Sequence, residues 1–234
     1  MPVAENIARI QEAIAAAAKR VGNKPEDVFL MAVSKTVPPE RMREAYQAGL
    51  RLFGESRIQE MAIKAGTLRD LKDAEWHMIG HLQNNKALKA AELFGAIESV
   101  DSLRLAERLN AATEQVGKTL AVLIEINVGG EEAKSGLPPQ STELQAILEA
   151  AKKLQYLEFR GLMTVPPFTP DPQGARPFFG KLRALRDQIA HARWPSVNMD
   201  VLSMGMSHDF EAAIEEGSTC VRIGTAIFGD RSFS

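Results

Sequence analysis

The sequence is short of the features that mark secreted, membrane-spanning or nucleic-acid-binding proteins. Its 234 residues include one cysteine, Cys220, which cannot form a disulfide within the chain. No stretch approaches the roughly 18 consecutive apolar residues of a membrane-spanning helix. The first residues lack the basic-then-apolar order of a secretory signal. A net charge of −2 provides no basic surface for nucleic acid or anionic lipid. We therefore expect a cytoplasmic protein that binds a small molecule, not nucleic acid or a membrane.

Short apolar stretches alternate with amphipathic stretches along the chain, an order typical of parallel strands covered by helices. The clearest strand is 120–127, which contains the continuous apolar run expected of a strand buried on both faces. Eight strands are predicted in all, at 29–34, 51–54, 75–80, 96–100, 120–127, 158–164, 198–203 and 219–223. Since undivided α/β barrels commonly reach about 200–250 residues, residues 1–234 are expected to form one domain, a (β/α)8 TIM barrel of the α/β class.

Helical spacing is clearest in two stretches between predicted strands, at Leu105, Leu109, Ala112 and Val116, and at Leu144, Ile147, Leu148 and Ala151. Asp101 suits an N-cap, and Gly49 and Gly117 suit helix ends. Pro38 and Pro39 suit the start of a helix. An additional helix is predicted before the first strand, where an apolar stripe would close the barrel bottom or form an interface; it consists of Ile7, Ile10, Ile14 and Ala18.

Two segments near the end of the sequence, 202–209 and 221–229, are apolar runs that give way to small residues. Phosphate often binds a TIM barrel after strands seven and eight, which is where these segments end. Ser207 could cap the helix that follows it, Gly224 permits close backbone approach, and Thr225 adds a hydroxyl. The segments therefore predict a phosphate site, although Ser207 as a simple N-cap and Gly224 as a simple turn remain the alternative.

A lysine, Lys35, follows the apolar run of the first predicted strand. At a barrel mouth, partial desolvation would disfavour its ammonium form and allow the amine to form an imine with a carbonyl. The alternative is a solvated lysine at a strand end. A reactive lysine and a phosphate site at one mouth fit a phosphorylated aldehyde, and the ligand that we infer is pyridoxal 5'-phosphate (PLP).

Six blocks, in order along nearly the whole chain, resemble the pyridoxal phosphate homeostasis proteins, which are related in fold to the barrel half of alanine racemases. They are 32–35, 53–56, 76–86, 161–164, 202–207 and 221–229. The resemblance implies a fold-type III PLP-binding barrel that acts in intracellular vitamin B6 homeostasis. It also implies that PLP is held as an imine without amino-acid turnover, and that the cofactor-binding residues are Lys35, Ser56, His77, Met204, Ser207, Arg222, Gly224 and Thr225. Of these, Lys35 would form the imine, Ser207, Gly224 and Thr225 would hold the phosphate, and Arg222 would lie by the pyridine nitrogen.

One position departs from the family pattern. Ser56 stands where the family usually has an asparagine that approaches the cofactor ring. Serine is shorter and lacks the paired donor and acceptor of an amide. We expect Ser56 to hold the ring more loosely.

Arg222 bears on whether the protein is an enzyme. A guanidinium stays charged and cannot accept a proton, so beside a pyridine nitrogen it weakens the ring as an electron sink. Racemases that share this arrangement use a tyrosine from an additional β-domain, whereas Tyr46 and Tyr156 are predicted to lie away from the mouth. These features weigh against a PLP-dependent racemase or lyase, which is kept as the alternative function. A sugar-phosphate enzyme with Lys35 as an aldolase-type base is a more distant one.

His77 and His81 are spaced for one helix face, but their segment is predicted as strand and loop, so we expect no metal site there. His77 is expected to line the cofactor pocket or to be a hydrogen-bonded barrel residue, and Cys220 to be a packed, unreactive thiol. PLP-dependent apo-enzymes are the expected recipients of the cofactor. We expect a monomer, because no β-domain requires a partner subunit.

Overall fold

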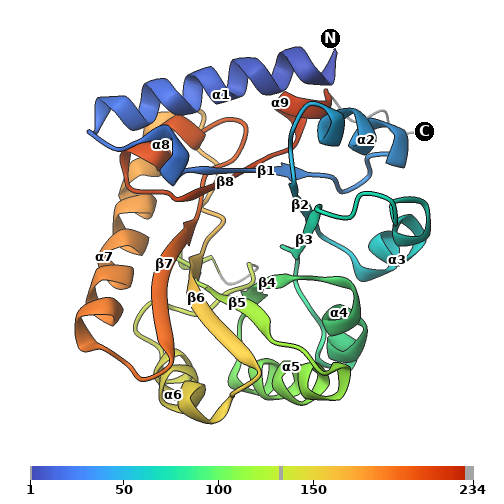
Figure 1. Ribbon diagram of the computed structural model, residues 1–234. Helices are drawn as coiled ribbons and strands as arrows, with labels where there is room; N and C mark the ends of the chain where they lie inside the picture. Colours follow the sequence, from blue (N-terminus) through green and yellow to red (C-terminus); the bar gives the residue numbers. More distant parts are fainter. Residues whose placement is uncertain (1, 132–133, 230–234) are drawn as a thin grey trace.

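The protein is a closed barrel of eight parallel strands surrounded by helices, as seen in a computed structural model that describes residues 2–131 and 134–229 (Figure 1). The strands are β1 (Phe29–Val33), β2 (Leu52–Glu55), β3 (Glu75–Met78), β4 (Ala96–Val100), β5 (Leu120–Glu125), β6 (Leu157–Met163), β7 (Val197–Ser203) and β8 (Cys220–Ile223). Each strand pairs with its neighbour in sequence, and β8 pairs with β1. The prediction of a (β/α)8 barrel is confirmed, and each predicted strand overlaps an observed one.

The helices form a ring outside the strands (Figure 1). They are α1 (Val3–Arg20), α2 (Pro39–Gln47), α3 (Ile58–Thr67), α4 (Ala87–Leu93), α5 (Leu103–Val116), α6 (Thr142–Ala150), α7 (Arg176–Ala192), α8 (Phe210–Glu215) and α9 (Thr225–Phe228). Short 3₁₀ helices lie at η1 (Pro25–Asp27), η2 (Asn84–Lys86), η3 (Ala151–Lys153) and η4 (Pro172–Ala175). Among the described helices, none is both long and apolar enough to cross a bilayer.

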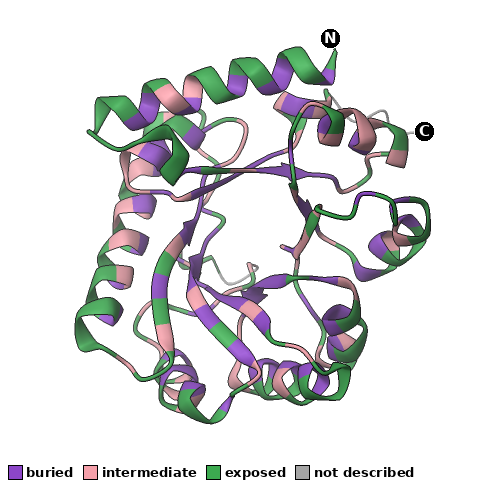
Figure 2. Cartoon of the chain, viewed as in Figure 1, coloured by how far each residue is buried: buried purple, intermediate pink, exposed green. Residues whose placement is uncertain are grey.

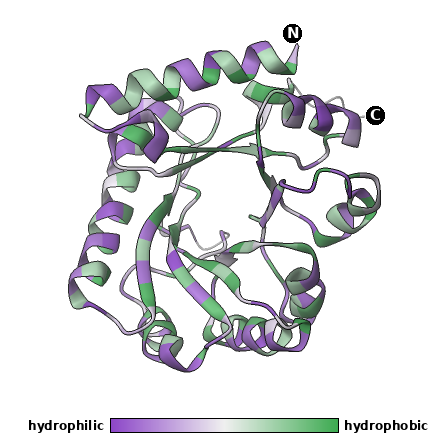
Figure 3. Ribbon diagram, in the orientation of Figure 1, coloured by the Kyte–Doolittle hydropathy of each residue, from purple (hydrophilic) through white to green (hydrophobic). Residues whose placement is uncertain are grey.

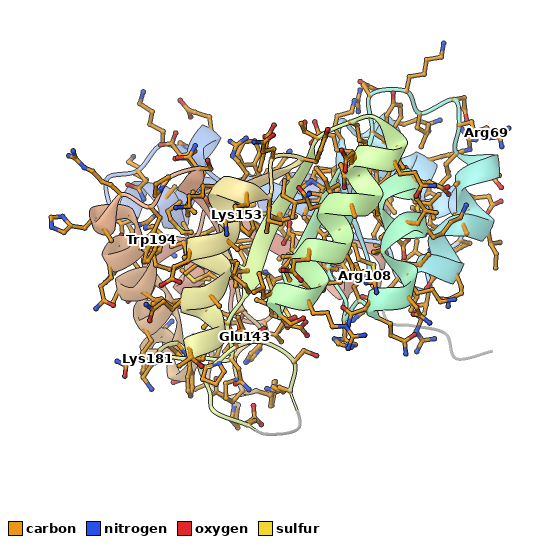
Figure 4. All side chains as sticks on the ribbon, turned by 90° about the horizontal axis from the view of Figure 1, so that it is seen from below. Arg69, Arg108, Glu143, Lys153, Lys181 and Trp194 are labelled. Carbon is orange, nitrogen blue, oxygen red and sulfur yellow. The ribbon has the colours of Figure 1, made fainter. Side chains whose placement is uncertain are left out.

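Apolar side chains fill the layer between the strands and this ring. Buried hydrophobic residues alternate with exposed hydrophilic ones along α1 and α7 (Figures 2 and 3). Viewed from the side of α5 and α6, charged residues of the outer ring such as Arg108, Lys153 and Lys181 project away from the strands (Figure 4). This is the pattern expected of helices that bury one face against a sheet.

Helix α1 lies along the barrel wall beside β8 and β1 (Figure 1). Of the two alternatives predicted for its apolar stripe, closure of the barrel bottom is therefore wrong. Its apolar stripe is buried in one cluster with Ala32 of β1 and Val221 of β8. The Asn6 amide donates to the carbonyl of Ile227 at 2.9 Å, which ties α1 to α9. Since α8 has six residues and α9 only four, they are too short to cover this wall, and α1 packs against both of them.

The predicted helix ends are mostly confirmed. Helix α2 begins at Pro39 with Pro38 as its N-cap, and Gly117 ends α5 in the left-handed conformation, with φ of 74°. The N-cap of α5 is Ser102, not Asp101, because the Ser102 hydroxyl accepts a hydrogen bond from the amide of Leu105 at 3.2 Å.

Candidate functional site

The predicted site residues all lie at the carboxyl ends of five consecutive strands, from β7 through β8 and β1 to β3. Their placement is as follows: Lys35 follows β1 after Ser34, Ser56 directly follows β2, His77 lies in β3, Met204 and Ser207 follow β7, Arg222 lies in β8, and Gly224 and Thr225 follow β8. Because the strands are parallel and adjacent, these residues share one arc of the barrel mouth. The fold thus brings together residues that are far apart in the sequence.

The end of β8 lies against the end of β1. Met31 is the register partner of Arg222. A Cβ added at Gly224 would lie 3.4 Å from the carbonyl oxygen of Val33, so the backbone of Gly224 is in contact with the last residue of β1. Lys35, which is half-buried, comes two positions later. The lysine and the predicted phosphate loop are therefore neighbours across the β8–β1 seam.

Ser207 serves a different helix from the one predicted. Its hydroxyl accepts a hydrogen bond from the Ala226 amide in the first turn of α9, at 3.3 Å. The N-cap of α8 is Asp209, whose carboxylate instead accepts from the amide of Met206 at 2.7 Å. Ser207 lies outside the helix, ahead of this cap, so its side chain is free to cross to α9. The loop after β7 and the start of α9 are thereby joined.

The loop after β7 also requires a glycine. Gly205 has φ of +93°, and a Cβ there would lie 2.5 Å from the Cβ of Ala213 in α8. Its carbonyl accepts a hydrogen bond from the backbone N–H of Arg222 at 3.0 Å. The tight turn at Gly205 therefore places the loop that carries Met204 and Ser207 directly beside β8. Met204 itself is fully buried in the apolar cluster that contains Ala213.

Arg222 is enclosed within the barrel, with 4% of its surface exposed. One terminal nitrogen, Nη1, donates to the Ser203 hydroxyl at 2.7 Å, and the other, Nη2, donates to the carbonyl of Thr164 at 2.7 Å. The Ser203 hydroxyl in turn donates to Glu98 Oε2 at 2.5 Å, and His77 Nδ1 lies 2.8 Å from Glu98 Oε1. Strands β3, β4, β7 and β8 thus contribute to one hydrogen-bonded chain, which fixes the orientation of the guanidinium.

The charge state of Glu98 determines which groups donate and which accept hydrogen bonds in this chain. Burial, with 1% of the residue exposed, opposes ionisation of Glu98. The hydrogen bond and charge of His77, with contributions from Arg222 and Ser203, outweigh burial and hold the pKa of Glu98 below its usual range. An ionised carboxylate only accepts hydrogen bonds, so His77 Nδ1 is the donor and Nε2 is the remaining ring nitrogen. Glu98 is a member of the site that sequence reasoning missed, although a carboxylate within an apolar strand is itself a signal.

A second buried carboxyl group lies on the neighbouring strand. Glu125, at the end of β5, has 8% of its surface exposed. Burial, reinforced by the charge of Asp101, raises its pKa to about 7, against the opposing charges of Arg222 and His81. Within residues 2–131 and 134–229, its Oε2 atom has no hydrogen-bond partner. Sequence reasoning also missed this residue.

Comparison with known proteins places the chain in a family. The family described as alanine racemase, N-terminal domain, matches residues 6–232. The pyridoxal phosphate homeostasis protein of Aquifex aeolicus is 44% identical over 233 residues, which cover all of both chains. That of Escherichia coli K12 is 43% identical over 235 residues, covering 99% of this chain and 98% of the relative. The chain belongs to the pyridoxal phosphate homeostasis proteins. This confirms the resemblance carried by the six sequence blocks.

Solved structures agree with this family. The PLP-bound structure of PipY from Synechococcus elongatus PCC7942 is 37% identical, with a TM-score of 0.84, and the match covers 97% of this chain and 100% of PipY. Alanine racemase from Corynebacterium glutamicum matches at 18% identity and a TM-score of 0.71, covering 98% of this chain but 61% of the racemase. This second likeness shows the alanine racemase barrel fold alone.

Of the other residues considered as reactive groups, the two tyrosines lie away from the mouth and Cys220 is packed. Tyr46 lies on α2 and its hydroxyl donates to Asp73, whereas Tyr156 precedes β6 at the opposite end of the barrel. Cys220 is buried, and burial raises the pKa of its thiol, as expected of a packed and unreactive cysteine. His81 is 3.1 Å from Asp101, so it faces a different carboxylate from His77.

Proposed function

We propose that the protein binds PLP at the barrel mouth, attaches it covalently to Lys35 and acts in intracellular vitamin B6 homeostasis. The observation that carries this proposal is the enclosed Arg222, held by Ser203 and Thr164 beside the strand that leads to Lys35. The names of the homologous proteins and the PLP in the PipY structure support the same ligand. The residues present fit PLP because a half-buried amine, a fixed guanidinium and a hydroxyl-lined loop share one mouth.

One set of residues would bind the phosphate of PLP, and another would bind its aldehyde and ring. Ser207 and Thr225 offer hydroxyls, and Gly224 lets the backbone approach, so this loop would hold the phosphate. Because α9 has four residues, its amides would act as individual donors and not through a long helix dipole. PLP would supply an aldehyde, and Lys35 would supply the amine that condenses with its carbon to form a C=N bond, with the carbonyl oxygen released as a water molecule. Ser56, His77 and Met204 would line the ring.

The same residues would discourage turnover of amino acids. Arg222 stays charged and cannot accept a proton, so it would keep a neighbouring pyridine nitrogen largely unprotonated and weaken carbanion chemistry. Tyr46 and Tyr156 lie away from the mouth and could not serve as its acid or base. We therefore propose that the protein stores PLP or passes it to apo-enzymes. We further propose that it works in the cytoplasm as a monomer and that residues 1–234 form one domain.

Spectroscopy with PLP tests the site directly. Added PLP is expected to produce an imine absorption band, and borohydride should reduce the C=N bond and fix the cofactor to a peptide that contains Lys35. Lys35→Ala should abolish the fixed adduct, whereas the control Lys89→Ala, in an exposed ion pair of α4, should leave it unchanged. A full adduct on Lys35→Ala, or no band with the unaltered protein, would overturn the proposal.

Incubation of the PLP complex with a panel of amino acids tests the absence of turnover. A stable band without racemised or decarboxylated product is expected, because Tyr46 and Tyr156 lie away from the mouth and Arg222 would weaken carbanion chemistry. Sustained product formation would instead favour the racemase or lyase alternative.

A further inference from the structure

The segment that carries Lys35 is held on both sides by charged residues that the binding site itself does not use. These residues are Glu55 at the end of β2 and Glu60 and Lys64 on α3, which we call the Lys64 cluster. The cluster lies next to Lys35 in space, but no part of it is assigned a role in the binding of PLP.

The Lys64 ammonium group is the centre of the cluster. It donates to Ser34 O at 2.8 Å, to Glu55 Oε1 at 2.9 Å and to Glu60 Oε1 at 2.6 Å. These three acceptors match the three N–H donors of an ammonium group. Lys64 is buried and Glu55 is fully buried, with 0% exposed, so the ion pair lies out of water, where its hydrogen bonds are strong and its loss is costly.

The cluster forms hydrogen bonds to Ser34, the residue before Lys35. Ser34 accepts the Lys64 bond through its carbonyl, and its hydroxyl donates to Glu55 Oε1 at 2.8 Å. The Ser34 amide also donates to the carbonyl of Gly54 at 2.9 Å. Both the backbone and the side chain of Ser34 are therefore fixed.

The cluster also forms a hydrogen bond to Thr36, the residue after Lys35. The backbone N–H of Thr36 donates to Glu60 Oε1, the same oxygen that accepts from Lys64. Thr36 has φ of +63°, a left-handed conformation that β-branched residues rarely adopt and that persists only where the surroundings enforce it. The Thr36 hydroxyl donates to the carbonyl of Lys35 at 2.6 Å, which stiffens the same turn.

We propose that Glu60, Lys64 and Glu55 are positioning residues that hold the Lys35 backbone so that its amine points at the cofactor aldehyde. The proposal rests on the proposed function, since it concerns covalent attachment at Lys35. Orientation matters to such a step because a displacement of about 1 Å can lower a rate by about 100-fold. The phosphate loop follows β7 and β8, whereas the cluster lies on β2 and α3, so cofactor capture and covalent attachment can be measured separately.

Glu60→Ala is the main test, because Glu60 is the outermost member and its loss leaves the Lys64–Glu55 pair in place. We expect about a 10-fold slower appearance of the borohydride-fixed adduct, with unchanged binding of pyridoxine 5'-phosphate, which lacks the aldehyde. Glu60→Gln keeps an oxygen for the Thr36 amide and should retain most of the rate. Glu92→Ala, which removes an exposed α4 carboxylate paired with Lys89, is the matched control.

A rescue experiment separates positioning from a general loss of structure. Asparagine adopts the left-handed conformation more readily than threonine. Thr36→Asn in the Glu60→Ala background should therefore recover part of the attachment rate. The thermal midpoints of the single and double variants should be the same, so that a difference in stability does not explain the recovery. Lys64→Met, which removes the ammonium group, should also slow attachment. If this variant fails to fold, Lys64→Arg, which keeps the charge, replaces it.

The outcomes distinguish the two proposals. Failure of the unaltered protein to form an adduct at Lys35 would overturn the proposed function. A normal adduct in the unaltered protein, with an equal rate in Glu60→Ala, would overturn only the positioning role. Parallel losses of pyridoxine 5'-phosphate binding and adduct formation would also contradict positioning, because they would indicate a general collapse of the mouth.

Discussion

The two sides of the barrel wall have opposite chemistry. Outside, Ile97 of β4 packs in the large apolar cluster beneath the helices. Inside, its neighbour Glu98 bonds to His77 and Ser203, in the chain that ends at Arg222. Because successive side chains of a strand point to opposite faces, one strand serves both regions. The difference teaches that the outer layer is built for burial of apolar surface, whereas the inner layer near the mouth is built to fix charged groups.

The largest expected effect comes from breaking the inner chain. Glu98→Ala would remove the buried carboxylate that bonds to His77 and Ser203 and whose charge opposes that of Arg222. Removal of one partner of a buried ion pair costs about 3–5 kcal/mol of unfolding free energy. Urea unfolding of the protein without PLP measures this loss. Glu98→Gln, which keeps an acceptor, should lose less, and an equal loss in both variants would show that charge is the whole effect.

Ile97, the residue before Glu98, tests the outer layer of the same strand. Ile97→Ala would leave a cavity in the outer layer and lower the free energy of unfolding by about 2–5 kcal/mol. The borohydride-fixed PLP adduct at Lys35 should remain stoichiometric while the protein is folded, since no mouth residue changes. Loss of the adduct from folded protein would break the separation between the two layers.

A pH titration distinguishes two carboxyl groups of the same interior. The pKa of Glu98 is lowered, whereas that of Glu125 is raised from its usual value of 4.5 to about 7. Between pH 4.5 and about 7, Glu125 binds more protons in the folded protein than in the unfolded chain. This residue therefore makes the free energy of unfolding fall as pH rises, and the whole loss remains above pH 7.

Glu125→Gln should remove that fall, which amounts to on the order of 3 kcal/mol. The measurement is the urea midpoint of both proteins across this pH range. An unchanged slope in the variant would mean that Glu125 ionises normally in the folded state.

The smallest effect is expected at the outer surface. Arg20 pairs with Glu211 at 2.8 Å and with Glu215 at 2.5 Å, and its own side chain is about half exposed. Exposed ion pairs contribute roughly 0–1 kcal/mol. Arg20→Ala should therefore change the urea midpoint little, and a loss comparable to that of Glu98→Ala would mean that burial does not govern the strength of these pairs.

Much of the barrel could be predicted because its signals are local. The apolar run 120–127 predicted β5, and the run before Lys35 placed that lysine at a strand end. Parallel strand order then brought Lys35 and Gly224 to one mouth. The exact partners could not be predicted in this way. Ser207 was expected to cap the helix after it, but it contacts Ala226 of α9, because the turn at Gly205 redirects the loop.

The sequence by itself determined the eight strands, the helices between them and the order in which Lys35, Arg222 and Gly224 reach the mouth, because apolar periodicity and chain order are properties of neighbouring residues. Only the tertiary structure decided that α1 covers the β8–β1 wall, that Glu98 joins Arg222 through Ser203, and that Lys64 fastens Ser34. These contacts join residues from separate strands and helices, and each depends on which side chains are buried together after the barrel closes.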